Sequence, residues 1–80
     1  SKISDQIFAS DSKAQDVIAL AKVLGESDLG ELDRKYLKFA EKFEESFLKQ
    51  EADERRNINQ TLDLALEILN ILPKEELNKL

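Results

Sequence analysis

The large apolar residues between positions 31 and 50 recur every three or four residues, which is the spacing of one face of an α-helix. They are Leu32, Tyr36, Phe39, Ala40, Phe43 and Phe47. Charged residues of both signs fill the other face, as in a helix with one side in water: Arg34, Lys35, Lys38, Glu41, Lys42, Glu45 and Lys49. Because an aromatic side chain buries roughly 150–250 Å², we predict that this apolar face is the centre of the core.

Two shorter helices are expected before this segment, over residues 2–10 and 13–24. Asp11 and Ser12 interrupt the apolar pattern between them, and Ser12 with Gln15 three residues later matches a capping box. The apolar residues of the two helices fall at helical spacing: Ile3, Ile7, Phe8, Val17, Ile18, Leu20, Ala21 and Leu24. We therefore predict a turn that separates the two helices.

A loop joins these helices to the aromatic one. Gly25 is suited to the positive φ that ends many helices, so we expect a loop over residues 26–30 with the side chain of Leu29 turned inward. The long helix is expected to begin near Glu31, because an acidic first turn suits the positive end of the helix dipole. The sequence leaves open whether residues 51–56 prolong this helix or form a turn.

The last part of the chain predicts two more helices. Asn57 and Gln60 form a second capping-box pair, which would start a helix over residues 58–72. Pro73 cannot continue that helix and suits the first turn of a new one over residues 73–80. The helix at 58–72 is apolar on two sides: Ile58, Leu62, Ala65, Leu69 and Leu72 on one, and Leu64, Leu66, Ile68 and Ile71 on the other.

Length and composition fit one small folded domain. Eighty residues make a single domain with a small core. Charged residues make up 36% and hydrophobic residues 41%, a balance typical of a folded helical protein rather than a disordered one. We predict one all-α domain over residues 1–80, a compact bundle of four to five helices that is monomeric when isolated.

The composition removes most routes to catalysis and metal binding. His and Cys are absent, so the commonest general base, metal ligand and thiolate are all missing. Glu44 and Glu67 are candidates for inward carboxylates, but a di-metal site in a bundle also needs His. The neighbours Glu75 and Glu76 diverge by about 100° around a helix and are predicted to be surface charges. We therefore predict no catalytic residue, no cofactor and no metal site, and hence no enzyme activity.

Charge and hydropathy also exclude two classes of partner. The net charge of −5 opposes binding to nucleic acid, because contacts to phosphates need a positive surface. No apolar run approaches the roughly 20 residues that cross a bilayer, and no signal peptide is visible. We therefore expect a cytoplasmic location without membrane insertion.

The sequence resembles the C-terminal helical domain of the non-catalytic B subunit of V-type and archaeal A-type rotary ATPases. The resemblance is carried by Leu24-Gly25-Glu26, Asp33-Arg34-Lys35-Tyr36-Leu37-Lys38-Phe39-Ala40, Phe43-Glu44, Phe47, Gln50, Thr61-Leu62-Asp63-Leu64, Glu67-Ile68-Leu69 and Leu72-Pro73-Lys74-Glu75-Glu76-Leu77. It implies a helical bundle at the base of a hexamer of alternating A and B subunits, close to the rotating shaft. It also implies that the nucleotide-binding domain lies upstream of the region that matches.

The resemblance implies a non-catalytic structural and interaction role in ion transport and ATP synthesis. The implied partners are the shaft and the A subunits, and the implied location is peripheral to the membrane. The part that faces the shaft is implied to be the turn between the first two helices, with the residues Ser10, Asp11, Ser12, Lys13, Ala14, Gln15 and Asp16.

The chain departs from that family's pattern at three places. The family has Gly where Ala14 stands, Gly-Phe-Tyr at residues 51–53, and Gly-Trp where Ala65 and Leu66 stand. Each change removes a Gly, which disfavours helix by roughly 0.5–1 kcal/mol relative to Ala. Such changes are also those a designer makes to stabilise an excised domain. These departures leave two possible origins for the chain. It is either a natural homologue or a redesigned helical bundle with no biochemical activity of its own.

Overall fold

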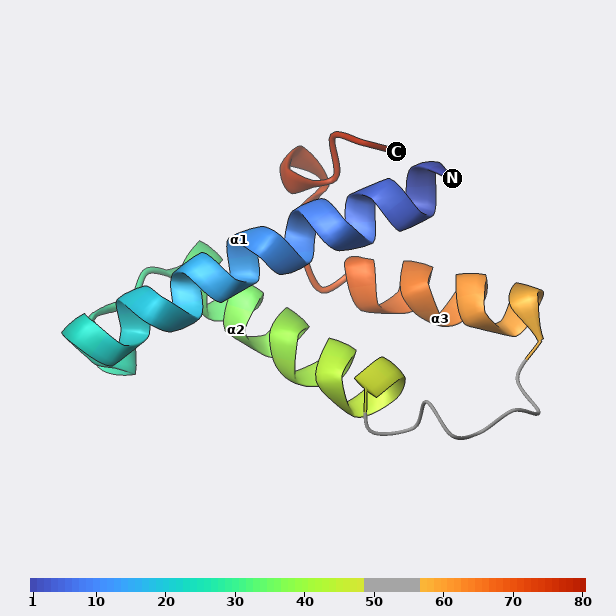
Figure 1. The fold of residues 1–80 in the computed structure, drawn as a ribbon. Coiled ribbons are helices and arrows are strands. Elements are labelled where there is room, and N and C mark those ends of the chain that lie inside the picture. The colour runs from blue at the N-terminus through green and yellow to red at the C-terminus, as the bar shows by residue number, and fades with distance from the viewer. Residues whose placement is uncertain (49–56) are drawn as a thin grey trace.

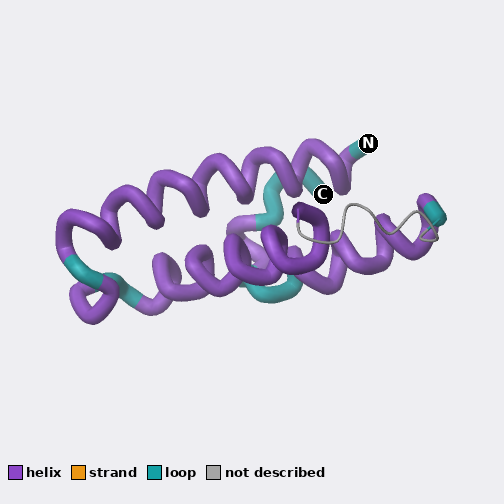
Figure 2. Tube along the Cα trace, turned by 60° about the horizontal axis from the view of Figure 1, so that its bottom comes forward, coloured by secondary structure: helices purple, strands orange, loops and turns teal. Residues whose placement is uncertain are grey.

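The computed structural model describes residues 1–48 and 57–80, and these residues contain helices and no strand (Figures 1 and 2). Their elements are α1 (Lys2–Leu24), a 3-10 turn (Glu26–Asp28), α2 (Glu31–Phe43), a π turn (Glu44–Leu48), α3 (Ile58–Leu69) and a second 3-10 turn (Lys74–Glu76). The all-α prediction is confirmed. Residues 49–56, where the choice between helix and turn was left open, lie outside the described residues.

Helix α1 runs unbroken for 23 residues, so the predicted turn at Asp11 and Ser12 is wrong. Neither Gly nor Pro occurs between residues 2 and 24, and Asp and Ser lower helix propensity by less than about 1 kcal/mol each. The expected capping box is replaced by a bond along the helix, in which Gln15 Nε2 donates to Asp11 Oδ1 at 3.3 Å. Two predicted helices are therefore one, and the described residues contain three α-helices where four to five helices were expected.

Helices α1 and α2 form an antiparallel hairpin, and α3 packs beside its open end (Figures 1 and 2). Gly25 ends α1 with a φ of 87°, as the sequence predicts. Leu29 is buried beneath the loop, which confirms its inward orientation. The hairpin places the aromatic face of α2 between α1 and α3.

The aromatic face of α2 lies at the centre of the core. Phe39 is fully buried and Tyr36 is 2% exposed. The Phe39 and Phe43 rings stack with their centroids 6.0 Å apart, and the Phe43 and Phe47 centroids lie 5.3 Å apart. The remaining buried apolar residues come from α1, α3 and the loops: Ile7, Ala14, Val17, Leu29, Ala65, Ile68, Leu69 and Leu72. The predicted core helix is therefore confirmed.

Helix α3 begins with the predicted capping box and ends earlier than expected. Asn57 Oδ1 accepts from the Gln60 backbone N–H at 2.8 Å, and Gln60 Oε1 accepts from the Asn57 N–H at 3.0 Å. The helix stops at Leu69, and a 3-10 turn at Lys74–Glu76 replaces the predicted C-terminal helix. The segment over residues 73–80 instead folds back beside the first half of α1 (Figure 1).

Two large apolar residues that fall at helical spacing in the sequence lie on the surface. Phe8 is 69% exposed, because the core-facing side of α1 passes through Ile7 and Phe8 lies about 100° further round the helix. Ile58 is 70% exposed, because it lies in the first turn of α3, at the end of that helix far from the hairpin (Figure 1).

Candidate interaction surface

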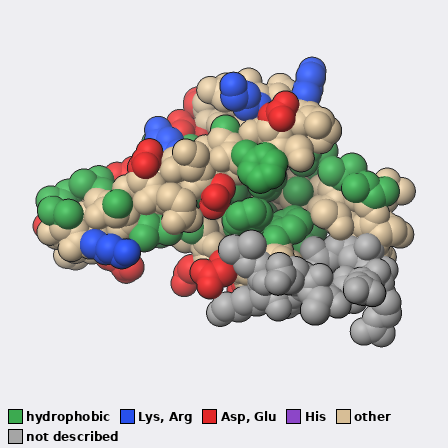
Figure 3. Space-filling model, in the orientation of Figure 1, with side chains coloured by type: hydrophobic (Ala, Val, Ile, Leu, Met, Phe, Trp, Pro, Cys, Tyr) green, Lys and Arg blue, Asp and Glu red, His purple; other side chains and the backbone are tan. Residues whose placement is uncertain are grey.

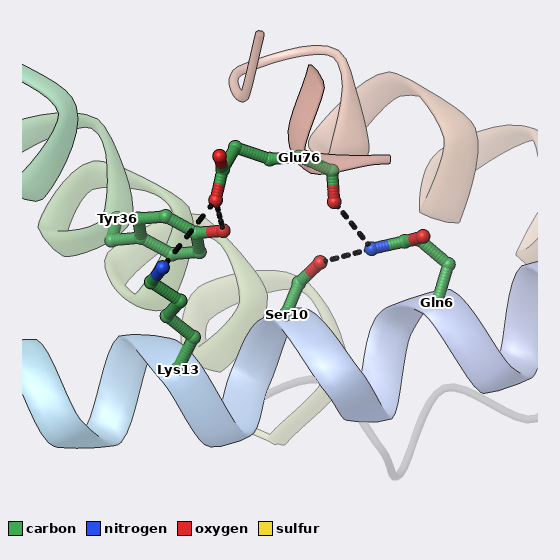
Figure 4. Close-up of polar contacts among 5 residues, drawn as sticks. All are labelled: Gln6, Ser10, Lys13, Tyr36 and Glu76. Atoms are coloured by element: carbon green, nitrogen blue, oxygen red, sulfur yellow. Dashed lines mark hydrogen bonds and ion pairs between the residues drawn. The ribbon is translucent and has the colours of Figure 1, made fainter. Parts of the chain in front are cut away.

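A polar cluster links the C-terminal segment to α1 and α2 (Figure 4). Gln6 Nε2 donates to Ser10 Oγ at 2.8 Å and to the Glu76 backbone carbonyl at 3.1 Å. The Tyr36 hydroxyl donates to Glu76 Oε1 at 2.5 Å, and Lys13 Nζ lies 3.7 Å from the same oxygen. The cluster therefore joins three segments that are far apart in the sequence.

The hydrogen bonds and charges of this cluster hold the C-terminal segment against α1 and α2. Burial raises the pKa of the Tyr36 phenol well above its usual value, and the hydrogen bond to Glu76 and the charge of that carboxylate raise it further. The phenol therefore stays protonated and acts as a donor. Lys13 Nζ also lies 5.6 Å from the Tyr36 ring centroid, within the range of a cation–π contact. Gln6 and Ser10 are 1% and 2% exposed, so this side of the cluster is closed to solvent.

Neither Glu76 nor the pair of Gln6 and Ser10 was predicted to form such a cluster. Glu76 was predicted to be a surface charge, yet its side chain is 21% exposed and holds two partners. Gln6 and Ser10 occupy the same face of α1 as the buried Val17, at helical steps of four and seven. A polar residue repeating on an apolar face is the signal that could have identified them.

The hairpin tip, defined as residues 20–31, presents a different kind of surface. Three of its apolar side chains are exposed: Leu20 is 41% exposed, Val23 81% and Leu24 48%. Hydrophobic side chains gather at this end of the molecule in Figure 3, which Figure 1 identifies as the end of the hairpin.

Acidic residues outnumber basic ones around the tip, where Lys22 is the one basic residue of positions 20–31. Between residues 23 and 33 the sequence contains no Lys or Arg. The charged residues there are all acidic: Glu26, Asp28, Glu31 and Asp33. The tip therefore combines exposed apolar side chains with a local excess of negative charge.

The predicted shaft-facing residues lie in the middle of α1. Ser10 and Ala14 are buried, and Asp11 is half-buried. The exposed members of the set are Ser12, Lys13, Gln15 and Asp16. Because no turn separates them, they form part of a straight helix surface.

The described ranges, 1–48 and 57–80, contain neither a metal-binding cluster nor a helix suited to cross a membrane. Within them, no three His, Cys, Asp or Glu residues come close enough together to hold a metal ion. Over the same ranges, no helix combines the length and the apolar character that a bilayer span requires.

Comparison with known proteins gives matches over nearly the whole chain. A "V-type ATP synthase beta chain 2" of Clostridium tetani is 49% identical over 78 residues, which are 98% of this chain and 17% of that protein. The B subunit of an A-type ATP synthase of Aeropyrum pernix is 51% identical over 76 residues, 95% of this chain and 16% of that protein. A "V-type ATP synthase beta chain" of Thermotoga neapolitana is 46% identical over 78 residues, again 98% and 17%.

This chain therefore spans about one sixth of the length of these relatives. The family described as the C-terminal domain of V and A type ATP synthase matches residues 1–80 without remainder. The chain belongs to the family of C-terminal domains of V- and A-type ATP synthases, in the form found in the B subunit.

Proposed function

We propose that this domain is a non-catalytic interaction module of a V/A-type ATP synthase, and that its hairpin tip docks against the central shaft. The remaining surface would contact the neighbouring A subunits, and the domain would lie in the peripheral head of the enzyme. The observation that carries the proposal is the exposure of Leu20, Val23 and Leu24 at one end of the molecule.

Exposed apolar side chains at a projecting end favour a contact with another protein. Removing apolar surface from water contributes roughly 25 cal/mol per Å², and fully burying a Val or Leu contributes about 1.5–3 kcal/mol. Grouped exposed apolar residues with polar neighbours commonly mark interaction sites. Val23 and Leu24 lie three and four residues after Leu20 on α1, so each shares a helix face with Leu20 and one partner surface can cover the group.

The acidic surroundings indicate what that partner surface carries. Four carboxylates lie at positions 26–33, and they outnumber the basic residues that flank them, Lys22 and Arg34. A complementary partner presents an apolar surface bordered by Lys or Arg, because opposite charges steer the encounter and fix its register. Binding to such a surface weakens as salt screens the charges, over a Debye length of about 10 Å at 0.1 M.

The exposed residues of the middle of α1 offer a second candidate contact with the shaft. Ser12, Lys13, Gln15 and Asp16 are polar and lie on the surface of one helix. Such a contact would depend on hydrogen bonds and charge rather than on apolar burial. Loss of binding in Asp16→Asn, with Val23→Gln unaffected, would identify this surface as the contact.

Binding to the purified shaft subunits tests the proposal. We expect Val23→Gln to weaken the affinity of the 80-residue chain about tenfold, because it removes the most exposed apolar side chain of the tip. The matched control is Ile58→Gln, which removes an apolar side chain of similar exposure on α3. Equal effects of the two changes would contradict the proposal. A redesigned bundle without activity would bind neither the shaft nor the A subunits.

A further inference from the structure

The loop of the hairpin tip is held by a side chain from α2. Arg34, in the first turn of α2, reaches back over the loop, and its Nε donates to the Leu29 carbonyl at 3.2 Å. Its Nη2 donates to the Ser27 carbonyl at 3.1 Å. One guanidinium therefore bridges two backbone carbonyls of the loop. This loop follows the end of α1 that carries the exposed Val23.

Within residues 25–30, all of which the structure describes, no backbone N–H donates to either of these carbonyls. The loop's own bonds run from the Asp28 N–H to the Gly25 carbonyl and from the Leu29 N–H to the Glu26 carbonyl, each at 3.2 Å. The carbonyls at the end of a short helical turn lack partners within that turn. Arg34 supplies a donor to both carbonyls. We call these two hydrogen bonds, at the C-terminal side of the 3-10 turn, the Arg34 clamp.

We propose that Arg34 is a positioning residue, whose two hydrogen bonds fix the loop in the conformation that presents the tip to its partner. This inference rests on the proposed function of the tip. The guanidinium suits the task because its donors are arranged in a rigid planar fork, whereas a Lys ammonium is a point charge on a flexible stem. The loop needs such a clamp because Gly25, at φ 87°, joins it to α1 through the most permissive residue type.

A fixed loop improves binding by lowering the entropy lost when the partner docks. An interface that must order a loop loses part of its interaction free energy in doing so, and a preorganised one does not. Arg34 itself need not touch the partner for this effect. Arg34 contributes by raising the fraction of time that the free domain spends in the binding conformation.

Three variants separate the clamp from the charge. Arg34→Gln removes both the fork and the charge, and Arg34→Lys keeps the charge and removes the fork. Lys38→Gln is the matched control, since it removes one positive charge from the exposed face of α2 one turn later. All three leave the aromatic core untouched, and thermal unfolding would verify that each is folded.

Amide hydrogen exchange and affinity for the purified shaft subunits are the two measurements. We expect the Asp28 and Leu29 amides of the free domain to exchange about tenfold faster in both Arg34 variants and unchanged in Lys38→Gln. The affinity should fall by a similar factor in the same two variants. Unchanged exchange in Arg34→Lys would overturn the clamp, and faster exchange with unchanged affinity would overturn its positioning role.

The outcomes also separate this inference from the proposed function. If the unaltered domain does not bind the shaft subunits, the proposed function fails, and the positioning role fails with it. If the unaltered domain binds and the Arg34 variants bind equally well, only the positioning role fails.

Discussion

Gln6 provides the sharpest test of what holds the C-terminal segment against α1, because this one buried side chain makes three hydrogen bonds. It donates to Ser10 Oγ and to the Glu76 carbonyl, and its Oε1 accepts from the Lys79 backbone N–H at 2.7 Å. The perturbation is Gln6→Ala. It removes all three bonds made by a side chain that is itself 1% exposed.

The expected cost follows from the number of bonds and their burial. Each hydrogen bond contributes a net 0.5–1.5 kcal/mol, so the three together contribute about 3 kcal/mol. A domain of this size has a free energy of unfolding of roughly 4–12 kcal/mol. The substitution therefore removes a quarter or more of the stability. The matched control is Gln15→Ala, in which the same change on the same helix removes one exposed bond, that to Asp11. We expect it to cost less than about 0.5 kcal/mol.

Urea unfolding followed by circular dichroism measures both variants, and amide exchange at Lys79 reports on the segment itself. If the segment opens locally, the Lys79 amide becomes unprotected even where the global transition moves little. We expect a large loss of stability, of protection of the Lys79 amide, or of both, in Gln6→Ala alone. Equal stabilities of the two variants, with Lys79 protected in both, would refute it.

Two further predictions concern particular groups. Tyr36→Phe should alter the pH dependence of stability. The phenol titrates near pH 10.0 in the unfolded chain and at a higher pH in the folded chain. The stability advantage of Tyr over Phe is therefore constant below pH 10.0 and shrinks as the pH rises above it. Denaturant unfolding between pH 7 and 11.5 measures this, and an advantage that stays constant to pH 11.5 would contradict the raised pKa. Asn57→Ala should lower the free energy of unfolding by about 1 kcal/mol through loss of the capping box, whereas Asn59→Ala, an exposed Asn within α3, should have a smaller effect; the reverse order would count against the cap.

Features set by local signals could be predicted from the sequence. The aromatic face of α2 follows from residue spacing alone, because apolar residues at steps of three and four can share only one side of a helix. The end of α1 at Gly25 and the start of α3 at Asn57 follow from backbone preferences of those residues. Each of these signals acts within one turn of helix, so no distant contact is needed to interpret it.

The errors arose where local signals were weak or the contact was distant. Asp11 and Ser12 resemble a helix start, but a helix already formed on both sides continues through them, because helix propagation is cooperative. The bond between Gln6 and Glu76 joins residues 70 positions apart, and no spacing rule predicts such a pair. Phe8 lies on the surface although its side chain is strongly apolar, because Ile7 beside it takes the core position.

Photo-cross-linking in the assembled ATP synthase tests the central claim most directly. A photoreactive phenylalanine analogue would replace Val23 at the hairpin tip or, as the control, Glu67 on the exposed surface of α3. We expect illumination to link position 23 to a shaft subunit and to leave position 67 unlinked to the shaft. A shaft cross-link from position 67, with none from position 23, would contradict it.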